Sequence, residues 1–85
     1  MYSKGQIVYS KTGRDKRRPF IVVDSDEQYV YLVDGDLRKL EKPKKKKIIH
    51  VQIVNVVVDD IKQKLENEAY LNDADFRKAL RLYKL

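Results

Sequence analysis

The 85-residue chain has no cysteine and no tryptophan, and it contains only three glycines, two prolines and one histidine. Without cysteine there is no disulfide, no thiolate metal site and no cysteine nucleophile. A single histidine cannot assemble a metal cluster, so the sequence predicts neither a metal nor a cofactor. The longest uncharged stretch, residues 48–58, is also much shorter than the ~20 apolar residues that span a bilayer.

Catalytic patterns are missing as well. Four carboxylates fall close together but lack the spacing of an EF-hand, and turn chemistry accounts for them: Asp24, Asp26, Asp34 and Asp36. There is no Ser-His-Asp set, no P-loop and no dinucleotide fingerprint. The N-terminus has no secretory pattern. These absences predict a non-enzymatic, cytoplasmic protein with no small-molecule substrate and no membrane partner.

Positive charge is concentrated in the first two thirds of the chain. Residues 1–58 hold 13 Lys and Arg against 7 Asp and Glu, a net charge of +6, whereas residues 59–85 are neutral. Two runs stand out, Arg-Asp-Lys-Arg-Arg at 14–18 and Lys-Pro-Lys-Lys-Lys-Lys at 42–47. Solubility explains net charge but not this clustering. Clustered cations suit a polyanion, because phosphate contacts supply most non-specific affinity for nucleic acids.

Short β-branched and aromatic segments predict five strands, at Gln6–Ser10, Phe20–Asp24, Tyr29–Val33, Leu37–Glu41 and Ile48–Ile53. Asp34-Gly35 is a two-residue hairpin signal of type I′ that should join the third strand to the fourth. In the last strand Ile49, Val51 and Ile53 alternate with His50 and Gln52, which predicts one buried face. The pattern predicts a mainly β fold, a small five-stranded SH3-like barrel, with both basic runs in its loops.

Residues 59–85 predict a helical C-terminal extension that packs on the open side of a barrel formed by residues 1–58. Asp59 or Asp60 should cap a first helix. Asn72 should cap a second, with Leu71 and Phe76 as a hydrophobic staple. An apolar stripe follows at Phe76, Ala79, Leu80 and Tyr83. Three cations fall near one face of this helix and could make a secondary RNA contact: Arg77, Arg81 and Lys84. Solvated helix faces are commonly charged, however, so the extension is expected to stabilise the barrel and to contribute little phosphate binding of its own.

The first basic loop contains the string Ser10-Lys11-Thr12-Gly13-Arg14-Asp15-Lys16. It resembles the KOW motif, a strand–loop–strand unit with a glycine in its loop. The likeness continues through Val33-Asp34-Gly35, Arg38-Lys39-Leu40, the Pro-Lys run and His50-Val51. Residues 4–53 thus resemble KOW-domain RNA-binding proteins, short bacterial relatives of an archaeal and eukaryotic-type large-subunit ribosomal protein. One departure is that such loops often carry a second glycine, whose place is filled here by Lys16-Arg17-Arg18.

The resemblance implies an SH3-like KOW barrel that binds structured RNA, such as ribosomal RNA or the large ribosomal subunit, in translation. The residues expected to contact RNA are the basic ones of the two runs and their surroundings: Lys11, Arg14, Lys16, Arg17, Arg18, Arg38, Lys39, Lys42, Lys44, Lys45, Lys46, Lys47 and His50. Gly13 and Gly35 are expected to be structural turn residues.

Two alternatives remain open: an SH3- or Tudor-like protein-interaction barrel, and a KOW protein of a transcription complex. The first is weaker because proline-rich peptides need aromatic-lined grooves, and the loops here are basic. Three tyrosines could stack on unpaired bases, namely Tyr9, Tyr29 and Tyr31. Tyr29 and Tyr31 share a face at period two, so packing in the core or at its rim is the favoured interpretation.

Overall fold

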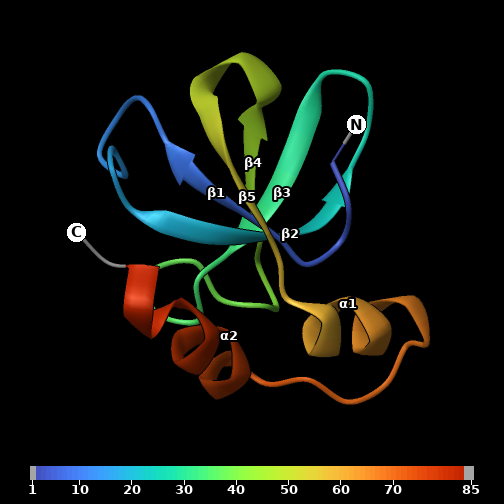
Figure 1. Ribbon diagram of the computed structural model, residues 1–85. Helices are drawn as coiled ribbons and strands as arrows, with labels where there is room; N and C mark the ends of the chain where they lie inside the picture. The colour runs from blue at the N-terminus through green and yellow to red at the C-terminus, as the bar shows by residue number, and fades with distance from the viewer. Residues whose placement is uncertain (1, 84–85) are drawn as a thin grey trace.

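The computed structural model describes residues 2–83. These residues form one open sheet of five antiparallel strands and two α-helices (Figure 1). The strands lie in the order β4-β3-β2-β1-β5. Their bounds are Gln6–Ser10 (β1), Pro19–Ser25 (β2), Tyr29–Val33 (β3), Lys44–Lys47 (β4) and Val51–Val57 (β5). Short 3-10 turns follow β4 and the second helix, at Ile48–His50 (η1) and Arg81–Tyr83 (η2). The structure confirms the prediction of a small, mainly β fold followed by C-terminal helices.

The sheet curls until its two edges approach each other. If it were flat, strands spaced about 4.8 Å apart would separate β4 from β5 by about 19 Å. The three residues of η1, which join these edge strands, advance the chain by only about 6 Å. Hydrogen bonds hold η1 on both sides, from the Ile48 amide to the Gln28 carbonyl at 2.9 Å and from the Lys11 amide to the His50 carbonyl at 2.8 Å. The strands therefore form a barrel-like layer.

Alternating side chains of the central strands supply two apolar clusters, one on each face of the sheet. The cluster inside the curl consists of Val8, Phe20, Val22, Val30, Leu32 and Val51. On the outer face, strand residues pack with helix residues in a cluster of Ile7, Ile21, Val33, Ile61, Phe76 and Leu80. Strands β1 and β2 are buried on both faces, which explains their continuous apolar character.

Helix α2 (Asp73–Leu80) begins where the sequence predicts. The Asn72 side chain accepts a hydrogen bond from the Asp75 amide at 3.1 Å, and the Asp75 carboxylate accepts one from the Asn72 amide at 3.0 Å. This reciprocal capping box satisfies two amides at the helix start. Phe76 is fully buried, and Leu71 packs on the same cluster, as expected for a hydrophobic staple.

Helix α1 (Asp59–Glu66) starts differently from the prediction. Its N-cap is Val58, whose side chain makes no capping hydrogen bond, while Asp59 and Asp60 lie in the first turn. Carboxylates there still interact favourably with the positive end of the helix dipole. Both helices lie below the sheet in the view of Figure 1 and cover its outer face through the second cluster. Within residues 2–83 no helix has the length and apolar character needed to cross a lipid bilayer.

The prediction of the fourth strand was wrong. Leu37–Glu41 is an irregular loop, and β4 is formed instead by the lysine run, which pairs with β3. Asp34-Gly35 makes no type I′ turn, since Gly35 has a positive φ (+78°) but Asp34 does not. The Asp34 and Gly35 amides both donate to the Arg38 carbonyl, at 3.0 and 3.1 Å. The chain thus makes a wider loop over residues 34–38. It begins to pair with the edge of β3 only at Lys44, six residues after Arg38.

The last strand also differs from the prediction, because β5 starts only at Val51. Val51 is buried, but Ile49 is 71% exposed and Ile53 is 47% exposed, so the predicted alternation fails for both isoleucines. For Ile49 the physical cause is η1, which interrupts the extended backbone before Val51 and places Ile49 on a turn.

Candidate nucleic-acid interface

The first basic run forms the loop between β1 and β2. Its base is closed by a 2.7 Å hydrogen bond from the Arg17 amide to the Ser10 carbonyl. Gly13 has a φ of +76°, as its expected turn role requires, and Arg17 has a φ of +71°. A non-glycine residue in this region is strained by about 1–2 kcal/mol. Arg17 therefore adopts the conformation that a second glycine in this loop would adopt without strain.

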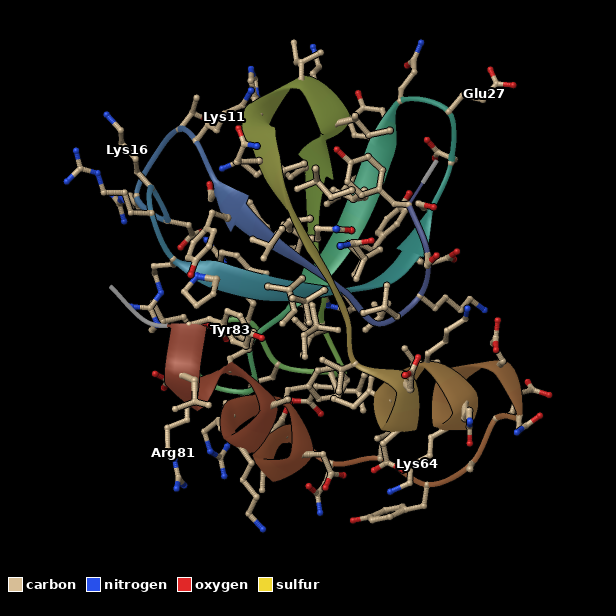
Figure 2. All side chains as sticks on the ribbon, viewed as in Figure 1. Lys11, Lys16, Glu27, Lys64, Arg81 and Tyr83 are labelled. Atoms are coloured by element: carbon tan, nitrogen blue, oxygen red, sulfur yellow. The ribbon has the colours of Figure 1, made fainter. Side chains whose placement is uncertain are left out.

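Four cations of this loop extend into solvent: Lys11, Arg14, Lys16 and Arg17. Figure 2 shows the labelled Lys11 and Lys16 pointing away from the sheet. Within residues 2–83 none of the four takes part in an ion pair. Their charge is therefore available to an anionic ligand.

Two arginines expected to contact RNA are instead bound to buried carboxylates. Arg18 Nη2 lies 3.3 Å from Asp34 Oδ2, and Arg38 Nη2 lies 2.9 Å from Asp15 Oδ2. Both aspartates are almost fully buried, with 5–6% of each side chain exposed. The two pairs join the first loop to the 34–38 loop. Arg18 and Arg38 therefore position the loops, and only their exposed third remains for a ligand.

The second basic run was expected in a loop, but it is the edge strand β4, so its lysines alternate between the two faces of the sheet. Lys44 and Lys46 pair with Leu32 and Val30, whose side chains lie in the inner cluster. These two lysines are half-buried, while Lys45 and Lys47 are exposed on the outer face. An edge strand made of lysine also discourages pairing with other chains.

Lys46 connects the two basic runs. Its Nζ donates a 2.8 Å hydrogen bond to the Thr12 carbonyl and lies 3.8 Å from the position of a Cβ on Gly13. Partial burial lowers the pKa of Lys46; Asp15 opposes this effect, and Lys44 and Arg38 add to it. The first loop therefore lies directly beside β4. We call the loop and both rows of β4 lysines together the basic face, with Lys44 and Lys46 on its inner side and Lys45 and Lys47 on its outer side.

A hollow of about 510 Å³ extends the basic face between the 34–42 region and β4. Five cations line it beside a single carboxylate: Arg38, Lys39, Lys42, Lys44 and Lys45, with Glu41. Leu37 and Pro43 complete its walls. A concave surface with this excess of cations attracts phosphate groups electrostatically.

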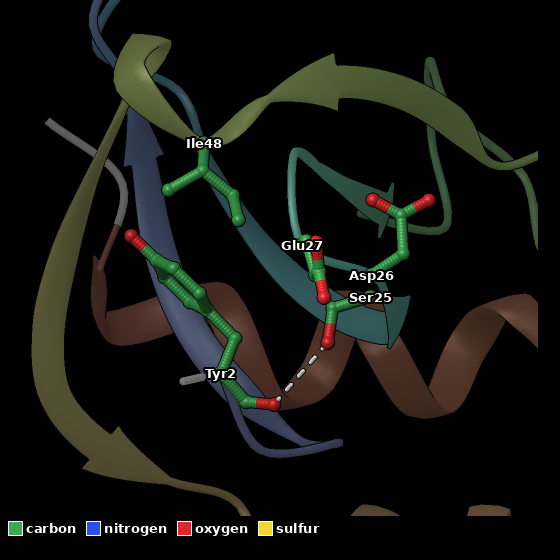
Figure 3. Close-up of a pocket in the computed structure, with 5 residues that line it drawn as sticks. All are labelled: Tyr2, Ser25, Asp26, Glu27 and Ile48. Carbon is green, nitrogen blue, oxygen red and sulfur yellow. Dashed lines mark hydrogen bonds between the residues drawn. The ribbon is translucent and has the colours of Figure 1, made fainter.

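A second cleft, of about 470 Å³, has the opposite character (Figure 3). It is lined by Tyr2, Ser25, Asp26, Glu27 and Ile48, and Ser25 Oγ donates a 3.4 Å hydrogen bond to the Tyr2 carbonyl. Hydrogen bonds from the amides of Gln28 and Tyr29 hold the pKa of the Asp26 carboxyl below its ordinary value. Its two carboxylates make this cleft unsuitable for phosphate.

The remaining candidates contribute less to the basic face. His50 was expected on the solvent face of the last strand but lies half-buried in η1. Arg77 donates a 2.6 Å hydrogen bond to the Gly35 carbonyl, Arg81 is exposed, and Lys84 lies outside the described residues. Residues 2–83 contain no group of three or more His, Asp or Glu side chains placed to hold a metal ion.

The sequence reasoning missed Asp15 and Asp34 as structural partners of arginines. Turn chemistry accounts for Asp34 in the sequence, and Asp15 lies inside the first basic run, so neither position signals its pairing with a distant arginine. No protein-family model and no curated protein matches this chain.

Proposed function

We propose that this protein is a non-catalytic RNA-binding protein of the KOW type. In this proposal it is an SH3-like barrel with a helical extension that associates with ribosomal RNA or the large ribosomal subunit in the cytoplasm. Its cations neutralise RNA phosphates, so affinity is mainly electrostatic and depends strongly on salt. The proposal joins the chemistry of the basic face to the KOW resemblance of residues 4–53.

The observation that carries the proposal is the junction of the two basic runs. They are 26 residues apart between Arg18 and Lys44, yet the Lys46 ammonium reaches the Thr12 carbonyl at 2.8 Å. The Asp15–Arg38 pair brings the 34–42 region to the same place. Cations that serve only solubility need no such convergence, whereas a polyanion gains from every charge it meets at once.

The curled sheet supports the SH3-like assignment. Its edge strands β4 and β5 are joined by a single 3-10 turn, and the β1–β2 loop lies beside that turn through the Lys11–His50 hydrogen bond. In the KOW string this loop carries the glycine and the first cations. A peptide-binding barrel is less well supported, because cations rather than aromatic rings line the hollow of the basic face.

Three exposed cations provide the test with little risk to the fold. A variant with Lys42→Gln, Lys45→Gln and Lys47→Gln removes charge from the basic face but leaves the Lys46 hydrogen bond in place. Its affinity for a structured fragment of large-subunit ribosomal RNA should be measured at several salt concentrations. Three lost phosphate contacts should reduce the slope of log Kd against log salt by about 2–3.

The matched control removes three charges from the helices, through Lys62→Gln, Lys64→Gln and Lys78→Gln. These residues lie on α1 and α2, below the sheet in Figure 1, and none of them lines the hollow of the basic face. The control should retain the wild-type slope. An equal loss of slope in both variants would mean that binding responds to net charge alone, and the proposed interface would be wrong.

A further inference from the structure

Tyr29 and Tyr31 lie on the outer face of β3, and neither ring belongs to an apolar cluster. They alternate with Val30 and Leu32, which are buried inside the curl. Within residues 2–83 neither tyrosine packs on the inner or the outer cluster, and both are half-buried. The two rings do share a face, as the period of two predicted, but core packing does not explain them.

The helices cover this face only in part. Val33, on the same outer face of β3, is fully buried in the cluster that α1 and α2 complete. Two and four residues earlier along the strand, Tyr31 and Tyr29 are no longer covered by those helices. In Figure 1, β3 begins at the end of the sheet beside η1, where neither α-helix lies, and runs toward α1 and α2. The rings of Tyr29 and Tyr31 therefore lie on a part of the outer face that neither α-helix covers.

The neighbours of these rings are cations from β4. Tyr31 pairs with Lys45 and Tyr29 pairs with Lys47 across the strands, so all four side chains share one face. Lys45 Nζ lies 4.3 Å from the centre of the Tyr29 ring, a cation–π contact. A solvated ammonium group can reach this position only if the face of the ring is open.

We propose that Tyr29 and Tyr31 form a stacking platform for unpaired nucleobases of a bound RNA, with Lys45 and Lys47 neutralising the adjoining phosphates. This inference rests on the proposed RNA-binding function and adds a ligand class, because duplex RNA does not offer free base faces to a sheet surface. A base that covers Tyr29 displaces the Lys45 ammonium, which then lies beside the backbone of the same strand.

The charges beside the two tyrosines also favour one orientation of the bound RNA. A bulge in β2 brings Asp24 opposite Tyr31, so the ring lies between a carboxylate on β2 and Lys45 on β4. Phosphate is repelled from the Asp24 side and attracted to the lysine side. The RNA backbone should therefore follow β4, with its bases directed over β3.

The test compares two RNAs of equal length, a single strand without pairing and a perfect duplex, against Tyr29→Leu and Tyr31→Leu. Leucine keeps an apolar side chain but removes the aromatic face. Loss of one stacked base should raise the Kd for the single strand about fivefold or more. The Kd for the duplex should change less than about twofold, because phosphate contacts are retained. Tyr29→Phe and Tyr31→Phe keep the ring and should bind like the wild type.

Tyr70, which is 80% exposed between the two helices, provides the control, and Tyr70→Leu should bind both RNAs normally. Circular dichroism of each variant establishes that the fold is retained. If the leucine variants lose affinity for both RNAs equally, or for neither, the platform is refuted while salt-dependent RNA binding stands. If the wild-type protein binds neither RNA, the proposed function itself fails.

Discussion

Replacing Gly35 with alanine tests how the 34–38 loop and helix α2 are held together. A Cβ on Gly35 would lie 2.1 Å from the Asp73 carbonyl oxygen. That oxygen belongs to the helix backbone and cannot rotate away, so the start of α2 would have to shift. Gly13 is a matched control: its φ of +76° is close to the +78° of Gly35, but its Cβ would meet only Lys46 Nζ at 3.8 Å.

The expected losses of stability differ because only one site has a steric conflict. An L-residue at this positive φ costs about 1–2 kcal/mol at either position. At Gly35 the shift also weakens two hydrogen bonds, from Arg77 Nη1 to the Gly35 carbonyl at 2.6 Å and from the Leu40 amide to Asp73 Oδ1 at 2.8 Å. Since hydrogen bonds with charged groups contribute about 1.5–3 kcal/mol and Arg77 is exposed, Gly35→Ala should cost about 3–5 kcal/mol.

Urea unfolding followed by circular dichroism measures both losses on one scale. In a domain of this size, 1 kcal/mol corresponds to a change in Tm of about 4–8 °C, so thermal unfolding should separate the variants clearly. If Gly13→Ala and Gly35→Ala destabilised the protein equally, Gly35 would not lie in close contact with the start of α2. The described packing of the 34–38 loop against α2 would then be refuted.

Two further predictions concern stability. Phe76→Ala should destabilise the protein by about 3–5 kcal/mol in urea unfolding, because the ring is fully buried between α2 and the sheet, whereas Leu82→Ala, at a site 91% exposed, should have almost no effect. For Asp26, the depressed pKa means that its ionised form stabilises the fold above the ordinary value of 3.8, and that this contribution is lost as the pH falls through the lower folded-state pKa. The difference in Tm between the wild type and Asp26→Ala should therefore shrink on acidification, and a constant difference would contradict the assignment.

Local patterns predicted the parts of the fold that depend on neighbouring residues. Asn72 and Asp75 are three residues apart, and a capping box needs nothing from the rest of the chain. The same holds for β1 and β3, whose predicted bounds match the structure, and for Gly13, which accepts a positive φ within its own loop. In each case the interaction that decides the structure lies within a few residues.

Long-range pairing decided what the sequence could not. Lysine has a low strand propensity, yet Lys44–Lys47 is a strand, because the free edge of β3 offers amides and carbonyls that need partners. Leu37–Glu41 has the better local pattern but is irregular, since the 34–38 loop is held by Asp34 and by contact with α2. Strand propensity depends on the residues of one segment. The backbone amides and carbonyls of a sheet edge, in contrast, can pair with whichever segment the tertiary structure brings to them.

The candidate site also combines features set by the sequence with features set by the tertiary structure. The sequence alone determined that this protein concentrates its cations in two runs and that Gly13 makes a turn, because charge and backbone freedom are properties of single residues. The tertiary structure decided which cations are free. Arg18 and Arg38 are bound to buried aspartates, and Lys44 and Lys46 face inward. Tyr29 and Tyr31 lie half-buried beside β4, on the part of the outer face that the helices do not cover. These outcomes depend on pairing register and burial, which arise only when distant segments pack together.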